Sequence, residues 1–563
     1  MSDDTIKSSY NSLDDVYCFN PYKDADAIND NIKYCHEVFE RIIPKIAAEY
    51  NERFSLDKSE KFYSVILSNW LMIYIEQMLE KYTSLKHFES FNSDDFFLDL
   101  SQRLYASDQL DYVQMVKESK TFNKQIYSQV FAFLFPSNQG KSHGEESLIS
   151  VSLDYTAYSR QYLGFHPWEI AKKLTKVVNN FFYNSSAIMS TTYNDKWAFT
   201  FSVRSFFKTY VEDMGFRDAV FKSEINVEKR GAPFWGNTED EFEEVLSALF
   251  LQHCPVSYFE LFEDLRSFVI DKYPQAPQFV YTAIGLASNT LLAYMLAEHC
   301  EKTKILIQQH GGNYGTDALH SYEFYERRIA DSYYTWGWSD NGQTIPLPSP
   351  ILLPFQKIKA TNKVCKGISL YLTGMPKVHF RLMQCNICAG NFLKYYLSDV
   401  QKFLTHIPNL YEITNVRGYP SSGRYGHGEL KLLKDKFTTI EFEDFSKSFV
   451  ESVSKTAICI IGHLATVHIQ TMVAGKPTLI FIQRDLYKHR EASIPYFDAL
   501  ERVGVLHYSP ESAAKKLLEI YRDPLAWWHQ ADVKEAVQQF LSVYGKTSDD
   551  TDRAFRLEFE KYQ

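Results

Sequence analysis

Ile305-Leu306-Ile307-Gln308-Gln309-His310-Gly311-Gly312-Asn313-Tyr314-Gly315 is an apolar run that ends in a polar, glycine-rich turn. The apolar half predicts a buried strand. The turn, residues 309–315, is called the elbow below. Its three glycines let the backbone bend sharply and approach a ligand closely, and His310 at its tip is of the residue type most often used for proton transfer. Because ligand sites of α/β proteins lie at the carboxyl ends of strands, the elbow is the first candidate for an active site.

The segments beside the elbow predict a parallel sheet. Residues 278–282 and 331–338 have the composition of strands, and residues 288–301 and 316–330 have the spacing of helices. This alternation of strands and helices implies crossover connections and an α/β fold. A helix that begins at residue 316 has free N–H groups that favour a carboxylate or a phosphate beside the elbow.

The rest of the chain divides into three parts. Residues 26–130 have helical periodicity and predict an N-terminal helical layer. The proline-rich residues 346–356 cannot continue a helix or a central strand, so they are interpreted as a linker. Beyond it the pattern predicts a second α/β sheet, with strands at 367–373, 411–416, 438–442, 457–461 and 477–482 and helices at 391–404, 445–453, 466–474 and 510–521. The resulting domains are 1–345 and 357–545, with a tail at 546–563.

Composition excludes several classes of protein. A chain of 563 residues is too long for one core, and its net charge of −10 argues against broad nucleic-acid binding. Eight scattered cysteines and a polar start without a signal peptide indicate a reducing compartment, with cytoplasm as the default. The most apolar stretch, residues 62–79, is too short and too polar to span a bilayer. Cys385 and Cys388 lack the second ligand pair that a zinc site requires, so no metal is expected.

A second candidate feature lies in the C-terminal half. Residues 457–466 run from a buried strand through Gly462 and His463 to a helix start at Thr466, and this pattern is typical of a phosphate cradle. Near expected strand ends, Arg381 and Arg417 have guanidinium groups suited to a carboxylate or a diphosphate. Ordinary surface salt bridges are the alternative for either arginine.

Three acidic residues follow the elbow. Glycosyl and acyl transfer need a base or a carboxylate nucleophile, and Asp317 and Glu323 are the candidates. Glu326 lies three residues after Glu323 on the same helix face, where a solvated role is favoured. The chain has no GxSxG, Walker A, HExxH or GxGxxG signature, so hydride transfer, P-loop phosphoryl transfer and zinc proteolysis have no support.

The elbow, together with four other segments, resembles a family of bacterial transferases of surface carbohydrate, from O-antigen and capsule loci. The other segments are Ser68-Asn69-Trp70-Leu71, Val256 to Glu260, Tyr334 to Trp338, and Leu464 to Pro477 with the tail Ala526-Trp527-Trp528. More distantly, the chain is similar to transferases that use CMP-activated 2-keto sugar acids such as Kdo or pseudaminic acid. Where the family typically has Gly-Pro-Trp-Leu, this chain has Ser68-Asn69-Trp70-Leu71.

The resemblance implies a GT-B-like architecture. Two Rossmann-type domains then face a cleft, with the acceptor on the N-terminal side and the nucleotide donor in the C-terminal domain. It also implies that Thr466 contacts donor phosphate and that the residue one turn later binds ribose. That residue is Gln470 in place of the usual Glu, and its amide can still hydrogen-bond a diol.

These observations lead to the hypothesis of a cytoplasmic glycosyltransferase of surface polysaccharide. It would transfer a sugar from a nucleotide-activated donor to a glycan or lipid-linked acceptor, without a cofactor or a metal. His310, Asp317 and Glu323 are the expected catalytic residues. Donor and substrate binding is expected from Gln309, Gly311, Gly312, Asn313, Tyr314, Gly315, Arg381, Arg417, His463, Thr466 and Gln470.

Two other functions stay open at this point. One is a polyol-phosphate transferase that uses CDP-glycerol, and the other is a non-catalytic scaffold of a polysaccharide export complex. Contact with the cytoplasmic face of the inner membrane is also open, because the expected acceptor is lipid-linked while no basic amphipathic helix stands out in the sequence.

Overall fold

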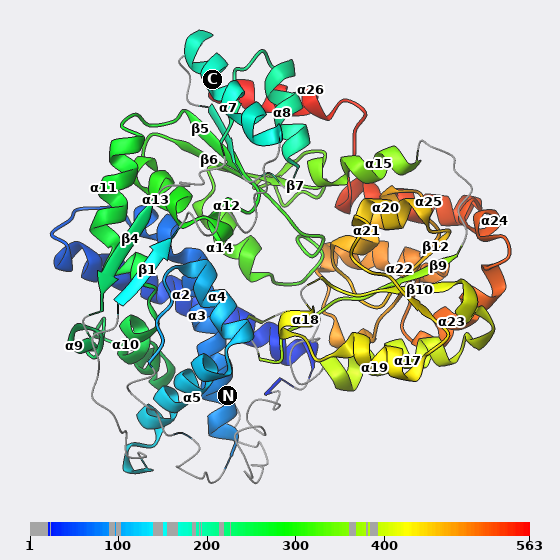
Figure 1. The fold of residues 1–563 in the computed structure, drawn as a ribbon, viewed down its shortest axis with the longest axis horizontal. Helices are drawn as coiled ribbons and strands as arrows, with labels where there is room; N and C mark the ends of the chain where they lie inside the picture. The colour runs from blue at the N-terminus through cyan, green and yellow to red at the C-terminus, as the bar shows by residue number, and fades with distance from the viewer. Residues whose placement is uncertain are drawn as a thin grey trace.

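The computed structural model describes residues 21–22, 24–88, 96, 103–138, 150–154, 167–182, 187–190, 192, 194–212, 219–225, 227–359, 367–378, 381–382, 392–420 and 422–563. Within these ranges the chain forms two six-stranded parallel sheets (Figure 1). The first sheet contains β2 (Ala187–Ser190), β3 (Tyr210–Val211), β5 (Phe279–Thr282), β6 (Lys304–Gln308), β7 (Ser332–Thr335) and β8 (Ile345–Pro346). The second contains β9 (Ile368–Tyr371), β10 (Thr414–Arg417), β11 (Glu441–Phe442), β12 (Ile458–Ile461), β13 (Thr478–Phe481) and β14 (Leu506–His507).

The strand orders define both sheets as doubly wound. The second sheet has the order β11-β10-β9-β12-β13-β14, which is the 3-2-1-4-5-6 order of the Rossmann fold. The first has the order β3-β2-β5-β6-β7-β8, which extends the flavodoxin-like order by one strand. The fold class predicted from the sequence, two Rossmann-type domains with an added helical layer, is confirmed.

Helices cover both sheets. Those of the first unit are α2 (Ala25–Arg53), α3 (Glu60–His87), α4 (Gln109–Glu118), α5 (Lys120–Leu134), α7 (Pro167–Phe182), α8 (Asp195–Arg204), α9 (Val227–Arg230), α10 (Glu241–His253), α11 (Phe262–Lys272), α12 (Gly285–Ser288), α13 (Thr290–His299) and α14 (Ser321–Ile329). Those that follow are α15 (Leu353–Lys359), α17 (Ser398–Thr405), α18 (Ser422–Tyr425), α19 (Glu429–Lys436), α20 (Phe449–Lys455), α21 (Thr466–Val473), α22 (Ile494–Arg502), α23 (Pro510–Ile520), α24 (Pro524–Trp528), α25 (Ala531–Tyr544) and α26 (Thr551–Phe559). Figure 1 shows α15, α20 and α21 on one side of the second sheet and α17, α19 and α23 on the other. A short antiparallel pair, β1 (Ser150–Asp154) and β4 (Val220–Glu224), lies apart from both sheets.

Helix α3 joins the helical layer to the elbow region. Its side chains are buried almost without a break from Phe62 to Tyr82, because it packs between α2, α13 and α14. Polar side chains of α3 meet the start of α14: Tyr325 donates to Asn69 Oδ1 at 2.9 Å, and the Ser321 hydroxyl donates to Glu76. The layer is therefore part of the wall around the elbow.

The helix after the elbow begins later than the sequence suggested. Helix α14 starts at Ser321, with His320 as its N-cap, and not at Thr316. The intervening residues pair with the second domain instead, since the Ala318 N–H donates to the Lys488 carbonyl at 3.0 Å and the Arg490 N–H donates to the Thr316 carbonyl at 2.8 Å. The helix start expected at residue 316 is therefore wrong, because contacts between domains hold residues 316–318 out of a helix.

The second domain differs from the expected pattern at several boundaries. Residues 408–413 form a 3-10 helix where a strand was expected to begin, and the strand starts at Thr414. The helix expected from residue 391 begins as a π-helical segment, Phe392–Leu397, before α17. The last strand, β14, is only two residues long and was not predicted.

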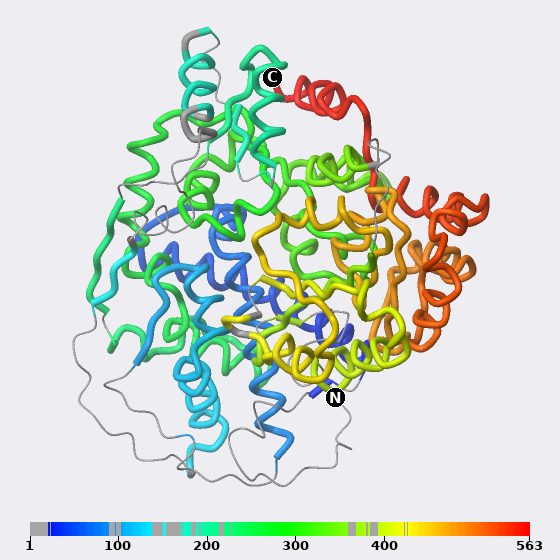
Figure 2. Tube along the Cα trace, turned by 45° about the vertical axis from the view of Figure 1, so that its right-hand side comes forward, coloured from blue at the N-terminus to red at the C-terminus, as the bar shows by residue number. Residues whose placement is uncertain are grey.

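The connection and the tail tie the two domains together. Helix α15 begins inside the expected linker, at Leu353. Pro354 is tolerated in its first turn because an N–H there would have no partner within the helix. Helix α26 returns to the first domain, where Phe555 and Phe559 are buried against Trp197 and Tyr281. In Figure 2 this red segment lies beside the teal helices of the first domain.

Candidate functional site

His310 forms a pair with a buried carboxyl group, Glu326. The Gln309 N–H still pairs with the Tyr334 carbonyl at 2.9 Å, so the elbow leaves the sheet immediately at the carboxyl end of β6. The His310 side chain is 10% exposed, and its Nδ1 lies 3.3 Å from Glu326 Oε1. The Tyr314 hydroxyl lies 3.1 Å from the imidazole nitrogens. An imidazole supported by a carboxylate in this way can accept a proton and be stabilised as the cation.

Glu326 is held by two tyrosines. Its Oε2 accepts a hydrogen bond from the Tyr333 hydroxyl at 3.1 Å and its Oε1 accepts one from Tyr314 at 3.4 Å. Burial raises the pKa of Glu326, while His310 and the hydroxyl donors oppose this shift. The expectation of a solvated Glu326 is therefore wrong. Sequence reasoning could have found it, because Tyr322, Tyr325, Glu326 and Ile329 follow the i, i+3, i+4, i+7 spacing of a buried helix face.

Asp317 is buried next to Asn313. The Asn313 amide donates to Asp317 Oδ2 at 3.2 Å. Burial raises the pKa of Asp317 to about 8; Asn313 lowers it, and the charge of Glu323 raises it further. At neutral pH this carboxyl group is mostly protonated, which suits a hydrogen-bond donor or an acid better than a nucleophile.

Glu323 forms ion pairs with two arginines. Its Oε1 lies 3.1 Å from Arg327 Nη1 and 2.8 Å from Arg490 Nη2, and its Oε2 accepts from the Gly315 N–H at 3.0 Å. Arg490 belongs to the second domain, so Glu323 connects the elbow to both domains. Both carboxylate oxygens of Glu323 thus have partners within the protein.

Gln309, expected to bind substrate, holds the elbow in place. Its Oε1 accepts from the Trp336 N–H at 2.9 Å and from the Trp338 indole N–H at 2.7 Å, and its amide donates to the Gly311 carbonyl at 3.0 Å. The side chain is 2% exposed. Sequence analysis missed this role because the tryptophans come from the loop after another strand.

The elbow contacts the cradle, residues 462–466, directly. The Gly312 N–H donates to the Thr466 hydroxyl at 3.1 Å, and the Asn313 amide donates to the Leu464 carbonyl at 3.3 Å. Thr466 is the first residue of α21, where the sequence predicted the helix start, and the N-cap position belongs to Ala465 and not to Thr466. The two features were expected on opposite walls of a cleft, but here they close against each other.

Two elbow glycines are explained by packing. A Cβ on Gly312 would lie 2.5 Å from the Ala465 carbonyl oxygen, so only glycine lets the domains approach this closely. Gly315 has a φ of 74°, and a Cβ there would meet the Trp338 indole at 2.5 Å. A Cβ on Gly311 would lie 3.3 Å from the Tyr314 ring. The Gly312 N–H already donates to the Thr466 hydroxyl and the Gly315 N–H to Glu323, so these two amides are taken up within the protein.

Two further residues expected to bind the donor, His463 and Gln470, lie on either side of the start of α21. His463 is 3% exposed, and burial lowers its pKa to about 4, so its imidazole is neutral at physiological pH. Its Nδ1 has no hydrogen-bond partner among the described residues. Gln470 is half-buried one turn after Thr466, on the same side of the helix.

A cavity of about 40 Å³ adjoins the elbow between the helical layer and both domains. Asp317, His320, Glu76 and Arg381 are among the residues that line it. The Arg381 guanidinium lies 4.9 Å from the centre of the Tyr322 ring. Burial raises the pKa of Glu76 to about 7, which leaves a second carboxyl group that titrates near neutrality in this cavity.

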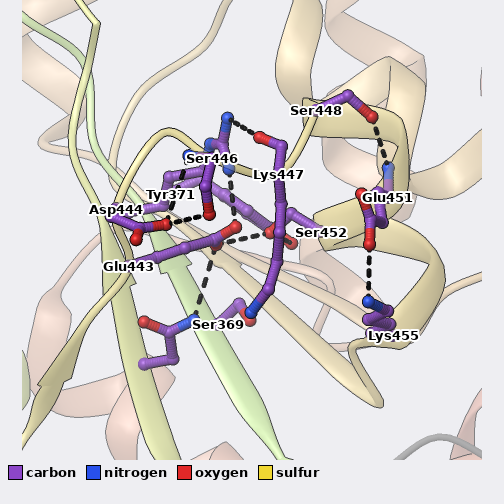
Figure 3. A network of polar contacts seen from close by, with 12 residues as sticks. Ser369, Tyr371, Glu443, Asp444, Ser446, Lys447, Ser448, Glu451, Ser452 and Lys455 are labelled. Carbon is purple, nitrogen blue, oxygen red and sulfur yellow. Dashed lines mark hydrogen bonds and ion pairs between the residues drawn. The ribbon is translucent and has the colours of Figure 1, made fainter.

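Arg417 belongs to a polar network of the second domain that is built from Glu443, Lys447 and Ser452. Its Nη1 lies 2.6 Å from Glu443 Oε1, and its Nη2 donates to the Lys447 carbonyl at 3.0 Å. Figure 3 shows Glu443 also accepting from the Ser452 hydroxyl, at 2.7 Å. The prediction that Arg417 grips a donor phosphate finds no support in this arrangement, because Glu443 neutralises its charge.

The described residues contain no group of three or more His, Cys, Asp or Glu side chains that could hold a metal ion. Cys385 and Cys388 lie outside these residues. In the same part of the chain, no helix combines the length and the apolar character needed to cross a membrane.

Two doubly wound domains that meet where the elbow contacts the start of α21 define a two-domain α/β protein of the GT-B type. A family model described as "LIC12162 family transferase" matches residues 4–559, so the chain belongs to this family of transferases. No curated protein is significantly similar to the chain.

Several solved structures are distantly similar. The wall teichoic acid polymerase TagF is 8% identical over 72% of this chain and 96% of its own, with a TM-score of 0.32. A putative UDP-N-acetylglucosamine 2-epimerase from Listeria monocytogenes is 11% identical over 67% and 96%, with a TM-score of 0.37. MurG from Acinetobacter baumannii is 12% identical over 66% and 98%, with a TM-score of 0.34.

Proposed function

We propose that this transferase is a glycosyltransferase of bacterial surface polysaccharide. It transfers a sugar from a nucleotide-activated donor to a glycan or lipid-linked acceptor at the cytoplasmic face of the inner membrane. The observation that carries the proposal is the His310–Glu326 pair after β6, in an elbow whose Gly312 contacts Thr466 at the start of α21. A base at the carboxyl end of the first sheet, beside a helix start of the second domain, suits the transfer of a sugar from a donor phosphate to an acceptor hydroxyl.

In this proposal His310 takes the proton of the acceptor hydroxyl. Glu326 positions the imidazole and stabilises its cation, as the carboxylate does in other histidine-based sites. Asp317, protonated at neutral pH because of its raised pKa, donates a hydrogen bond or a proton to the departing phosphate. Glu323 keeps the elbow and Arg490 in place.

The donor is proposed to lie along the start of α21. Thr466, His463 and Gln470 supply a hydroxyl, a neutral imidazole and an amide there, and Arg381 supplies positive charge from the adjoining cavity. A CMP-activated 2-keto sugar acid, with one phosphate and one carboxylate, is a donor of matching charge. Because the cavity of about 40 Å³ holds only a few water molecules, the two domains must separate before a nucleotide sugar can enter.

Product analysis tests the proposal. The purified chain is incubated with CMP-Kdo, UDP-sugars or CDP-glycerol and a lipid-linked glycan acceptor, and the product mass is measured. A mass increase of one sugar supports a glycosyltransferase. An increase of one glycerol phosphate would identify a polyol-phosphate transferase instead. A non-catalytic scaffold is indicated if calorimetric titration finds no binding of CMP, CDP or UDP.

A further inference from the structure

One side of helix α3 forms a wall of the cavity beside the elbow. Met72, Ile73 and Glu76 line this cavity. They follow Asn69 by three, four and seven residues, so all four lie along one side of the helix. Asn69 accepts the hydrogen bond from Tyr325 that joins α3 to α14. The helical layer thus reaches the cavity and places a carboxyl group, Glu76, in its wall.

The Glu76 side chain connects three parts of the molecule. It is 1% exposed. Its Oε1 accepts from the Ser321 hydroxyl at the start of α14, and its Oε2 accepts from the Leu382 N–H at 3.0 Å. Ser321 belongs to the first domain, whereas Leu382 follows β9 of the second domain. One buried carboxyl group of the helical layer is therefore bonded to both domains.

The bond to Leu382 holds the backbone next to Arg381. The Arg381 guanidinium lies over the Tyr322 ring and lines the same cavity as Glu76. Burial raises the pKa of Glu76, while its two hydrogen bonds and the charge of Arg381 oppose this rise. Glu76 thus acts on Arg381 in two ways, through the neighbouring N–H and through its charge.

Other contacts between the helical layer and the second domain are weaker. The layer itself is fixed to the first domain, because α3 packs against α13 and α14. Helix α18 of the second domain lies against α4 of the layer (Figure 1), with Arg424 ion-paired to Glu118 at 3.4 Å. Lys488 is ion-paired to Asp26 at 2.6 Å. Both pairs are partly exposed to solvent, so each contributes little. The buried bond from Leu382 to Glu76 is the strongest of these three contacts.

We propose that Glu76 is a positioning residue that holds the second domain closed against the helical layer and keeps Arg381 over the cavity. The inference rests on the proposed function, in which Arg381 supplies positive charge to the donor. Because the domains must separate to admit a nucleotide sugar, the Leu382 N–H leaves Glu76 on opening and returns to it on closure. A hydrogen bond to a charged group favours the closed state roughly 10- to 100-fold.

Hydrogen exchange of the Leu382 amide tests the contact without any ligand. In the full chain, Glu76→Met removes both acceptor oxygens at similar side-chain size, so this amide should exchange at least about tenfold faster. Glu76→Gln keeps one acceptor oxygen and should recover most of the protection. Glu118→Met is the matched control, because it removes a partly exposed ion pair, and its exchange should stay within about twofold of wild type. Melting temperatures and circular dichroism establish that each variant is folded.

Nucleotide binding tests whether Glu76 acts through Arg381. Calorimetric titration with CMP, CDP and UDP should give a dissociation constant raised about tenfold in Glu76→Met and in Arg381→Gln. The double variant should lose little more than either single variant, because both changes act through one guanidinium. If the wild type binds none of these nucleotides, the proposed function is contradicted, and the exchange measurement alone decides whether Glu76 holds the domains closed.

Three results would overturn the proposal. The first needs no variant: the Leu382 amide of the wild type exchanges as fast as in an unfolded peptide. The second is a folded Glu76→Met whose Leu382 exchange stays within about twofold of wild type, or an equal effect in Glu118→Met. The third is an additive loss of nucleotide affinity in the double variant, because Glu76 and Arg381 then act independently.

Discussion

His310 and Glu326 are the side chains on which the proposed chemistry depends. His310→Ala removes the proton acceptor and should reduce turnover at least about 100-fold. Glu326→Gln keeps the shape of the side chain but removes its charge, so we expect a lower kcat with a KM near that of the wild type. Steady-state kinetics, with the donor identified by product mass, measures kcat and KM of both variants.

Glu560→Gln changes an exposed carboxylate elsewhere and serves as the control. Turnover of His310→Ala within about threefold of wild type would exclude the proposed base.

Asp317 should make folding stability depend on pH. Burial raises its pKa from 3.8 to about 8, so between these values the folded chain keeps a proton that the unfolded chain has released. Its contribution to the free energy of unfolding is therefore full below about pH 4 and declines as pH rises toward 8, by at most about 1.4 kcal/mol per unit. Urea unfolding between pH 5 and 8 should show a less steep decline in Asp317→Asn. Parallel pH profiles for the two proteins would contradict the raised pKa.

The sequence alone could not show which acidic side chain at this site is ion-paired and which is buried without a counter-charge. Asp317, Glu323 and Glu326 all follow the elbow within a short distance in the sequence. Their different surroundings come from partners far along the chain: Arg490 pairs with Glu323, and Tyr333 donates to Glu326. Desolvation and ion pairing are properties of the folded neighbourhood, so they decide which carboxyl group is charged.

At the scale of elements, the elbow and the start of α21 form one contact between domains. Gly312→Ala places a Cβ 2.5 Å from the Ala465 carbonyl oxygen, which must push the elbow and α21 apart. We expect a marked loss of kcat and a larger radius of gyration in solution scattering. Gly236→Ala is the matched control, because a Cβ there meets nothing within 4 Å. If Gly312→Ala behaves like the control, close approach of the two elements is not required for activity.

The alternation of strands and helices was predictable because it depends on local periodicity. The strand before the elbow was expected to end near residue 308 and β6 ends at Gln308; the helix expected from 466 is α21. The helix start at 316 was wrong, since residues 316–318 pair with 488–490 of the other domain. Short edge strands such as β14 have too few residues for a periodic signal.

At the scale of the whole molecule, helix α26 packs the C-terminal end of the chain against the first domain. Phe555 is fully buried, with its ring centre 4.8 Å from that of Trp197. Phe555→Ala should cost about 3–5 kcal/mol of unfolding free energy, because it leaves a cavity in this contact. Leu557→Ala on the same helix removes a side chain that is 58% exposed and should change stability by less than about 0.5 kcal/mol. Urea unfolding compares them, and equal effects would show that α26 contributes little to the core.

The sequence by itself determined the α/β class, the two sheets and the position of the elbow, because strand and helix periods and glycine-rich turns are local properties. Only the tertiary structure decided that Glu326 is the partner of His310, that Gly312 meets Thr466, and that Glu76 of the helical layer meets the Leu382 backbone. Each of these depends on burial and on contacts between residues far apart in the chain. The same apolar spacing that predicts a helix does not state which way the helix faces, and that choice is made by what packs against it.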